Sequence, residues 1–133
     1  MYLKWLLVIV FSSYTLSTNA KECEPFDTCT ISFYHLIPSP GKYENVIIRI
    51  VGVAKNVDDK WFLFPSIDAA RYNLYEQSIE VNLTNAEVKT ALKTGQYAYI
   101  QGIFTQAHDN SIPEIIGVID KEVKVTRLDP SHY

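Results

Sequence analysis

Residues 46–54 read Val-Ile-Ile-Arg-Ile-Val-Gly-Val-Ala and are the most clearly predicted β-strand of this 133-residue chain. β-Branched residues dominate the run, and such residues favour the pleated conformation of a strand. Gly52 interrupts the run near its end. A glycine weakens a strand unless the backbone must bend or bulge there, so the stretch predicts a strand with a sharp change of direction.

Two further strands are predicted downstream of this one. Asp58 and Asp59 indicate a turn, and residues 61–64 (Trp-Phe-Leu-Phe) read as a short strand. Residues 66–76 break the pattern and form an insert. Residues 77–83 then alternate between apolar and polar side chains, as in a half-buried strand. Its predicted inner face comprises Ile79, Val81 and Leu83.

Two helices are predicted beside the strands. Residues 84–95 carry a capping box, with Thr84 as N-cap and Glu87 at the third helical position, and Gly95 suits the helix end. Residues 31–37 predict a shorter helix with Phe33, Leu36 and Ile37 on one face, before two prolines stop it.

The last two predicted strands span residues 96–105 and 115–128. In the first of them, Ala98, Ile100, Gly102 and Phe104 share one face. A helix between the third and fourth of five strands is the arrangement of an OB-fold. We therefore predict a mainly β domain over residues 31–128, with one or two short helices and a five-stranded Greek-key barrel. Gly52 and Gly102 are predicted to lie where barrel strands bend.

The N-terminal residues 1–20 have the three-part order of a secretory signal peptide. A basic start with Lys4 precedes an unbroken apolar run over 5–11, and the small residue Ala20 ends the segment. The apolar run is too short for a spanning helix, which needs roughly 18 residues or more. We expect a periplasmic or secreted protein with no stable membrane insertion after cleavage.

Cys23 and Cys29 lie in a predicted N-terminal loop, residues 21–30. Because an exported chain meets oxidising conditions, we expect a disulfide between them. A lipid on Cys23 is the alternative, but Ala20-Lys21-Glu22 is the wrong run before a lipidated cysteine. Residues 129–133 read as a polar tail.

The charge composition argues against one class of partner, nucleic acids. Removal of residues 1–20 takes away Lys4 and no acidic residue, which leaves 11 basic and 15 acidic residues and a net charge of −4. Nucleic-acid binding depends on phosphate neutralisation by Lys and Arg, and no basic stripe occurs, so we expect no nucleic-acid partner.

The strand and turn patterns resemble small bacterial OB-fold domains of secreted or periplasmic proteins, a family of uncharacterised function. Residues 36–43 (LIPSPGKY) and 48–53 (IRIVGV) resemble the turn and first strand of those domains. Residues 95–104 (GQYAYIQGIF) resemble their fourth strand, and 116–128 their last. The resemblance covers most of residues 33–128 and implies the fold. It implies no catalytic residues.

The sequence contains no catalytic or metal-binding motif that would favour an enzyme. His35, His108 and His132 lack metal-ligand spacing, and there is no nucleophile elbow or phosphate loop. A metal held by His108, Asp109 and Glu114 is the alternative to an ordinary solvated loop. We therefore expect a non-catalytic protein with no metal and no cofactor.

The aromatic residues suggest binding instead. Strands two and three form the usual ligand face of an OB-fold, and Tyr and Arg are frequent in interface hot spots. We predict that a protein or peptide partner, as for an immunity or inhibitor protein, binds at Trp61, Phe62, Arg71, Tyr72 and Tyr75. A small ligand or cell-wall glycan on an aromatic face is the alternative function. In the competing interpretation of the residues, Tyr72 and Tyr75 cover the core as a lid.

Overall fold

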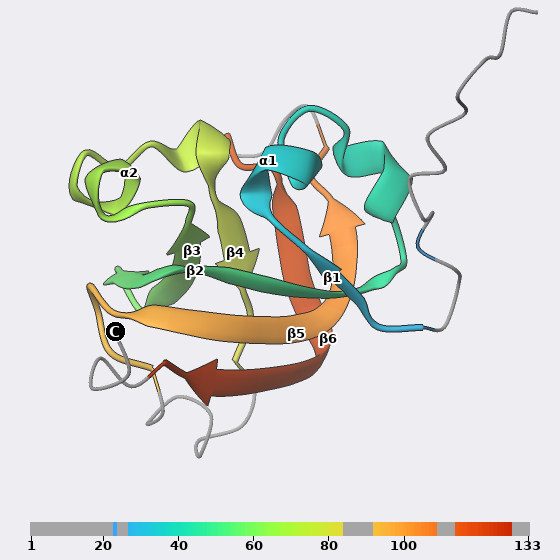
Figure 1. The fold of residues 1–133 in the computed structure, drawn as a ribbon. Coiled ribbons are helices and arrows are strands. Elements are labelled where there is room, and N and C mark those ends of the chain that lie inside the picture. The colour runs from blue at the N-terminus through green and yellow to red at the C-terminus, as the bar shows by residue number, and fades with distance from the viewer. Residues whose placement is uncertain (1–22, 24–26, 84–91, 109–113, 129–133) are drawn as a thin grey trace, which may run out of the picture.

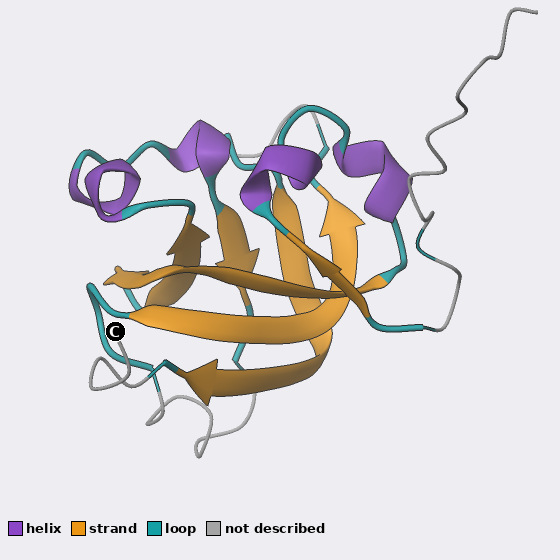
Figure 2. Cartoon of the chain, viewed as in Figure 1, coloured by secondary structure: helices purple, strands orange, loops and turns teal. Residues whose placement is uncertain are grey.

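A computed structural model describes residues 23, 27–83, 92–108 and 114–128 of the chain. The described part is mainly β (Figures 1 and 2). In chain order its elements are β1 (Cys29–Ile31), α1 (Phe33–Leu36), the 3-10 helix η1 (Pro40–Tyr43), β2 (Ile47–Val57), β3 (Lys60–Phe64), α2 (Ile67–Arg71), the 3-10 helix η2 (Tyr75–Gln77), β4 (Ile79–Val81), β5 (Tyr97–Gln106) and β6 (Gly117–Arg127).

Five of the strands close into a barrel. The order runs β2-β3-β4-β6-β5, and β5 pairs back onto β2. All neighbours are antiparallel except β4 and β6, which are parallel. This is the OB-fold arrangement, so the predicted fold class is confirmed. The short helices lie along one side of the barrel (Figure 2).

A sixth strand, β1, was missed by the sequence reasoning. It runs parallel to β2, with Cys29 opposite Ile48 and Ile31 opposite Ile50. The sequence reasoning had placed these residues in the cysteine loop and at the start of the first helix. A three-residue strand gives too short a pattern to be recognised, and its pairing depends on a partner far along the chain.

Strand β2 changes partners in its middle. Its residues 47–53 pair with β5, while 53–57 pair with β3 along the opposite edge. Gly52 lies at this change, and a Cβ there would be 2.6 Å from both the Phe64 carbonyl oxygen and the Leu63 side chain. The bend therefore brings β3 so close to β2 that only glycine fits.

Gly102 marks a second irregularity, opposite β6. The pairing of β5 with β6 shifts register on either side of Ile103, and Glu122 has a left-handed φ of 55°. A Cβ on Gly102 would be 2.9 Å from the Lys121 carbonyl oxygen and would also contact Ile119. Both glycines thus lie where a barrel strand changes its partner or its register, and at each of them a Cβ would collide with neighbouring atoms.

The barrel interior holds the main core. The predicted inner faces of residues 79–83 and 98–104 are buried, as are Ile48 and Ile50 of β2. Phe33 and Leu36 of α1 pack onto the same core. Ile37, predicted on the same helix face, is instead 38% exposed because α1 ends at Leu36.

The Cys23–Cys29 disulfide is present, and both cysteines are partly buried against the main core. No helix within the described ranges is long and apolar enough to cross a membrane. Three predictions fall outside the described residues: the signal peptide over 1–20, most of the helix over 84–95 and the tail over 129–133.

We expect Gly52→Val and Gly102→Val each to lower the free energy of unfolding by about 1–3 kcal/mol, because a larger side chain would displace backbone atoms. Gly41→Ala is the matched control, since its Cβ would contact only the Gln106 side chain at 3.4 Å. Urea unfolding followed by circular dichroism measures all three. Wild-type stability in both valine variants would argue against the close strand contacts.

We expect the Cys23→Ser/Cys29→Ser double variant to keep its fold. The ring between the cysteines is short, so the disulfide constrains little of the unfolded chain and its loss costs about 2 kcal/mol. Thermal unfolding of the variant should remain cooperative. If the cooperative transition disappears, the disulfide contributes more to the fold than its short ring explains.

Candidate binding surface

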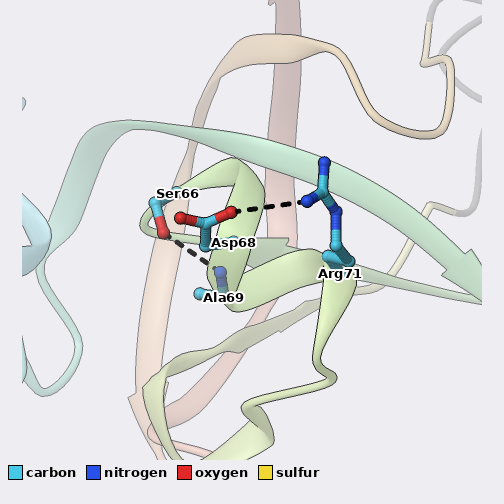
Figure 3. Close-up of polar contacts among 4 residues, drawn as sticks. All are labelled: Ser66, Asp68, Ala69 and Arg71. Carbon is cyan, nitrogen blue, oxygen red and sulfur yellow. Dashed lines mark hydrogen bonds and ion pairs between the residues drawn. The ribbon is translucent and has the colours of Figure 1, made fainter.

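The insert between β3 and β4 contains a well-capped short helix. Ser66 is the N-cap of α2, and its side-chain oxygen accepts a hydrogen bond from the Ala69 backbone N–H at 3.1 Å (Figure 3). Asp68 and Arg71 lie one turn apart on the solvent side, with a long ion pair of 3.9 Å (Figure 3). This exposed pair contributes little to stability.

The insert forms a second apolar cluster outside the barrel. Leu63 of β3 points into the barrel core, so Phe62 and Phe64 point to the outer face of the strand. There they pack with Ala69 and Ala70 of α2. Tyr75 completes the cover, with ring centroids 5.2 Å from Phe62 and 5.9 Å from Phe64. The outer face of β3 is therefore buried by the chain's own insert.

Polar contacts fix the insert to the barrel in its middle and at its C-terminal end. The Lys55 ammonium of β2 donates to the Ala70 carbonyl oxygen at 2.8 Å and to Asn73 Oδ1 at 2.6 Å. Ser78 is fully buried, and its hydroxyl donates to the Tyr75 carbonyl oxygen at 2.8 Å. The Ser78 carbonyl in turn accepts from the Ile116 backbone N–H at 2.9 Å, just before β6. These bonds make the insert a part of the folded domain.

The five predicted site residues do not form one outward surface. Phe62 is only 4% exposed, and Tyr75 is half-buried against it, so neither side chain forms an open outward surface in the free chain. Trp61 packs toward the barrel core. Arg71 and Tyr72 are exposed, Tyr72 at 68%. Tyr75 covers the outer cluster on β3 and not the main core in the barrel, and the exposed Tyr72 ring covers neither.

A different part of the barrel exposes aromatic and basic side chains. Arg49 of β2 is paired with Gln101 of β5, and Val51 is paired with Tyr99. Directly opposed residues in an antiparallel pair share one face, and Ile50 on the other face is in the core. We define the β2–β5 face as Arg49, Val51, Tyr97, Tyr99 and Gln101.

Two features distinguish the β2–β5 face. The Arg49 guanidinium lies 4.7 Å from the centre of the Tyr99 ring, a cation–π contact. Tyr97, opposite Val53, is 39% exposed. The alternation over residues 96–105 places Tyr97 and Tyr99 on the strand face opposite Ala98 and Ile100. It could not show that this side stays open while the outer side of β3 is covered.

A small groove continues from the β2–β5 face to the insert. It has a volume of about 180 Å³ and is almost entirely apolar. Val53 and Lys55 come from β2, and the remaining lining residues are Ile67, Ala70, Arg71, Thr94 and Gly95. The groove therefore lies where α2 meets the bent part of β2.

The described residues hold little that resembles a catalytic or metal site. Ser32 Oγ and His35 Nδ1 are 3.0 Å apart, but both lie at the exposed start of α1. A more polar hollow of about 250 Å³ includes Glu76, His108 and Glu114. Within the described ranges no three His, Cys, Asp or Glu side chains are grouped as metal ligands, and Asp109 lies outside those ranges.

Comparison with known proteins adds nothing specific about function. No protein-family model matches the chain, and no curated protein matches it in sequence. Among solved structures, the chain is similar to the Entamoeba histolytica asparaginyl-tRNA synthetase in complex with asparaginyl-adenylate, at 14% identity and a TM-score of 0.46. The match covers 80% of this chain and spans about a quarter, 25%, of the synthetase. A likeness at this level carries no information about activity or partners.

Two tyrosine variants distinguish a ring that covers the outer cluster, Tyr75, from a ring exposed to solvent, Tyr72. We expect Tyr75→Ala to lower the free energy of unfolding by about 1–3 kcal/mol, because it uncovers the Phe62 and Phe64 rings. Tyr72→Ala should change it by about 0.5 kcal/mol or less, because that ring is mostly in solvent. Denaturant titration of both variants measures the difference. Equal stability losses would contradict the assignment of Tyr75 to the outer cluster.

Proposed function

We propose that this chain is an exported, non-catalytic OB-fold module that binds a protein or peptide partner through its β2–β5 face, together with Arg71 and Tyr72 of the insert. The observation that carries the proposal is the burial of the outer face of β3 by α2 and Tyr75. An OB-fold habitually binds ligands on that face. With it covered, Arg49 of β2 and Tyr97 of β5 remain exposed on the outer side of the neighbouring strand pair.

The chemistry of this face favours a protein partner. Tyrosine presents a large, stiff and amphipathic ring, and Tyr and Arg are enriched among residues that dominate interface energies. The contact between Arg49 and Tyr99 holds two such side chains together before binding. The proposed surface has two arginines, Arg49 and Arg71, on an acidic chain, and is poorly suited to a phosphate backbone, which needs several cations.

Export is supported by the disulfide. Cys23 and Cys29 are joined, and a structural disulfide persists in an oxidising compartment such as the periplasm or the extracellular space. The signal-peptide pattern of residues 1–20 points to the same compartment.

Affinity capture from the extracytoplasmic fraction of the native host tests the proposal. The mature protein should retain a partner that an Arg49→Gln/Tyr97→Ser variant loses by tenfold or more. Tyr34→Ser is the matched control, because Tyr34 is 89% exposed on α1, outside the β2–β5 face. A partner retained equally by all three proteins would contradict the proposed face. Recovery of a glycan or small molecule in place of a protein would favour the alternative function.

A further inference from the structure

We infer that the groove between α2 and β2 binds the C-terminal residue of a peptide, with an apolar side chain in the groove and the terminal carboxylate at its rim. This inference rests on the proposed function, because it assigns the partner's end to a place beside the β2–β5 face. It concerns the groove formed by Val53, Ile67 and Ala70 and the cations Lys55 and Arg71.

The floor of the groove fits an apolar side chain. Val53 and Ala70 are buried at its base, while Ile67 on its wall is 47% exposed. Covering an exposed isoleucine beside an apolar hollow removes apolar surface from water and therefore stabilises the complex. The volume of about 180 Å³ is similar to that of a cavity that admits benzene, roughly 150 Å³. One leucine or phenylalanine side chain therefore fits.

The rim of the groove has hydrogen-bond donors that are still available to a ligand. An ammonium has three donors, and Lys55 uses two of them on Ala70 and Asn73. Arg71 has five donors, and its 3.9 Å contact with Asp68 is too long for a hydrogen bond. Thr94 accepts a hydrogen bond from the Asn56 N–H, so its hydroxyl can still donate. The described lining residues include no acidic side chain.

This division of apolar floor and basic rim selects among anionic groups. An aspartate or glutamate side chain that entered the groove would bring its carboxylate onto the apolar floor, where desolvation disfavours the charge. In a C-terminal residue the side chain and the carboxylate leave the same carbon in different directions. The side chain can then occupy the floor while the carboxylate remains at the rim with Lys55 and Arg71.

The groove is continuous with the proposed binding face. Val53 is directly paired with Tyr97, so the exposed Tyr97 ring stands on the same side of the sheet as the groove floor. A peptide that lies along the β2–β5 face would therefore reach the groove at its end. The two surfaces together suit a partner with a free C-terminus.

Nuclear magnetic resonance titration of the mature protein tests this inference. The probe is a pentapeptide, glycine-serine-glycine-serine-leucine, with a free carboxylate. We expect it to shift the amide signals of Ala70, Thr94 and Gly95 and to bind at least tenfold more tightly than the same peptide with a C-terminal amide. Arg71→Gln should weaken binding at least fivefold without altering the fold. Lys42→Gln is the matched control and should change binding less than twofold, because Lys42 is an exposed cation of η1 outside the groove and the β2–β5 face.

Several outcomes would overturn the inference. These are equal binding of acid and amide, no shifts at the groove with millimolar peptide, and unchanged binding in Arg71→Gln. Equal binding of sodium octanoate would assign the groove to free fatty acids. Lys55→Met is a less direct variant, because Lys55 also holds the insert. If the peptide does not bind but the partner is captured as expected, only this inference is wrong. If the peptide binds the groove but the β2–β5 variant still captures the partner, only the proposed face is wrong.

Discussion

The architecture depends on the curvature of β2. This strand pairs with β5 along its first half and with β3 along its second, so it must turn sharply while keeping both ladders. Gly52 permits the turn because its missing side chain leaves room for the backbone of Phe64 and for Leu63. Barrel closure, the buried interior and the position of β3 all follow from this close approach.

The bend also determines where the insert can lie. Beyond Gly52, the outward side chains of β2 change from an open face to a covered one. Val53 packs with Phe62 and Phe64 under α2, and Lys55 reaches the end of that helix. Before Gly52, Arg49 and its Tyr99 neighbour stay at the surface. A single strand thus contributes to both the closed outer face and the open one, with the groove between them.

Most strands and their inward faces could be predicted from the sequence because they depend on local alternation. The barrel followed from the order of the elements, with a helix between the third and fourth predicted strands. The alternation over residues 79–83 and 98–104 was sufficient to identify their buried sides. The exposure of the candidate site residues was predicted less well. Phe62 alternates with Leu63 in a way that predicts an outward ring, and only the tertiary position of α2 shows that this ring is covered. Strand β1 was missed because three residues are too few to show an alternation of apolar and polar side chains.

The insert closes the outer face of β3 and leaves the β2–β5 face at the surface. Nuclear Overhauser effects between aromatic ring protons in the free protein test this closure most directly. The ring centroids of Tyr75 and Phe62 are 5.2 Å apart, so protons of these two rings should give strong cross-peaks. Cross-peaks are also expected between the ring protons of Phe64 and Tyr75. Absence of these cross-peaks, with a rapidly averaging Tyr75 ring and solvent-accessible Phe62 and Phe64, would contradict the account.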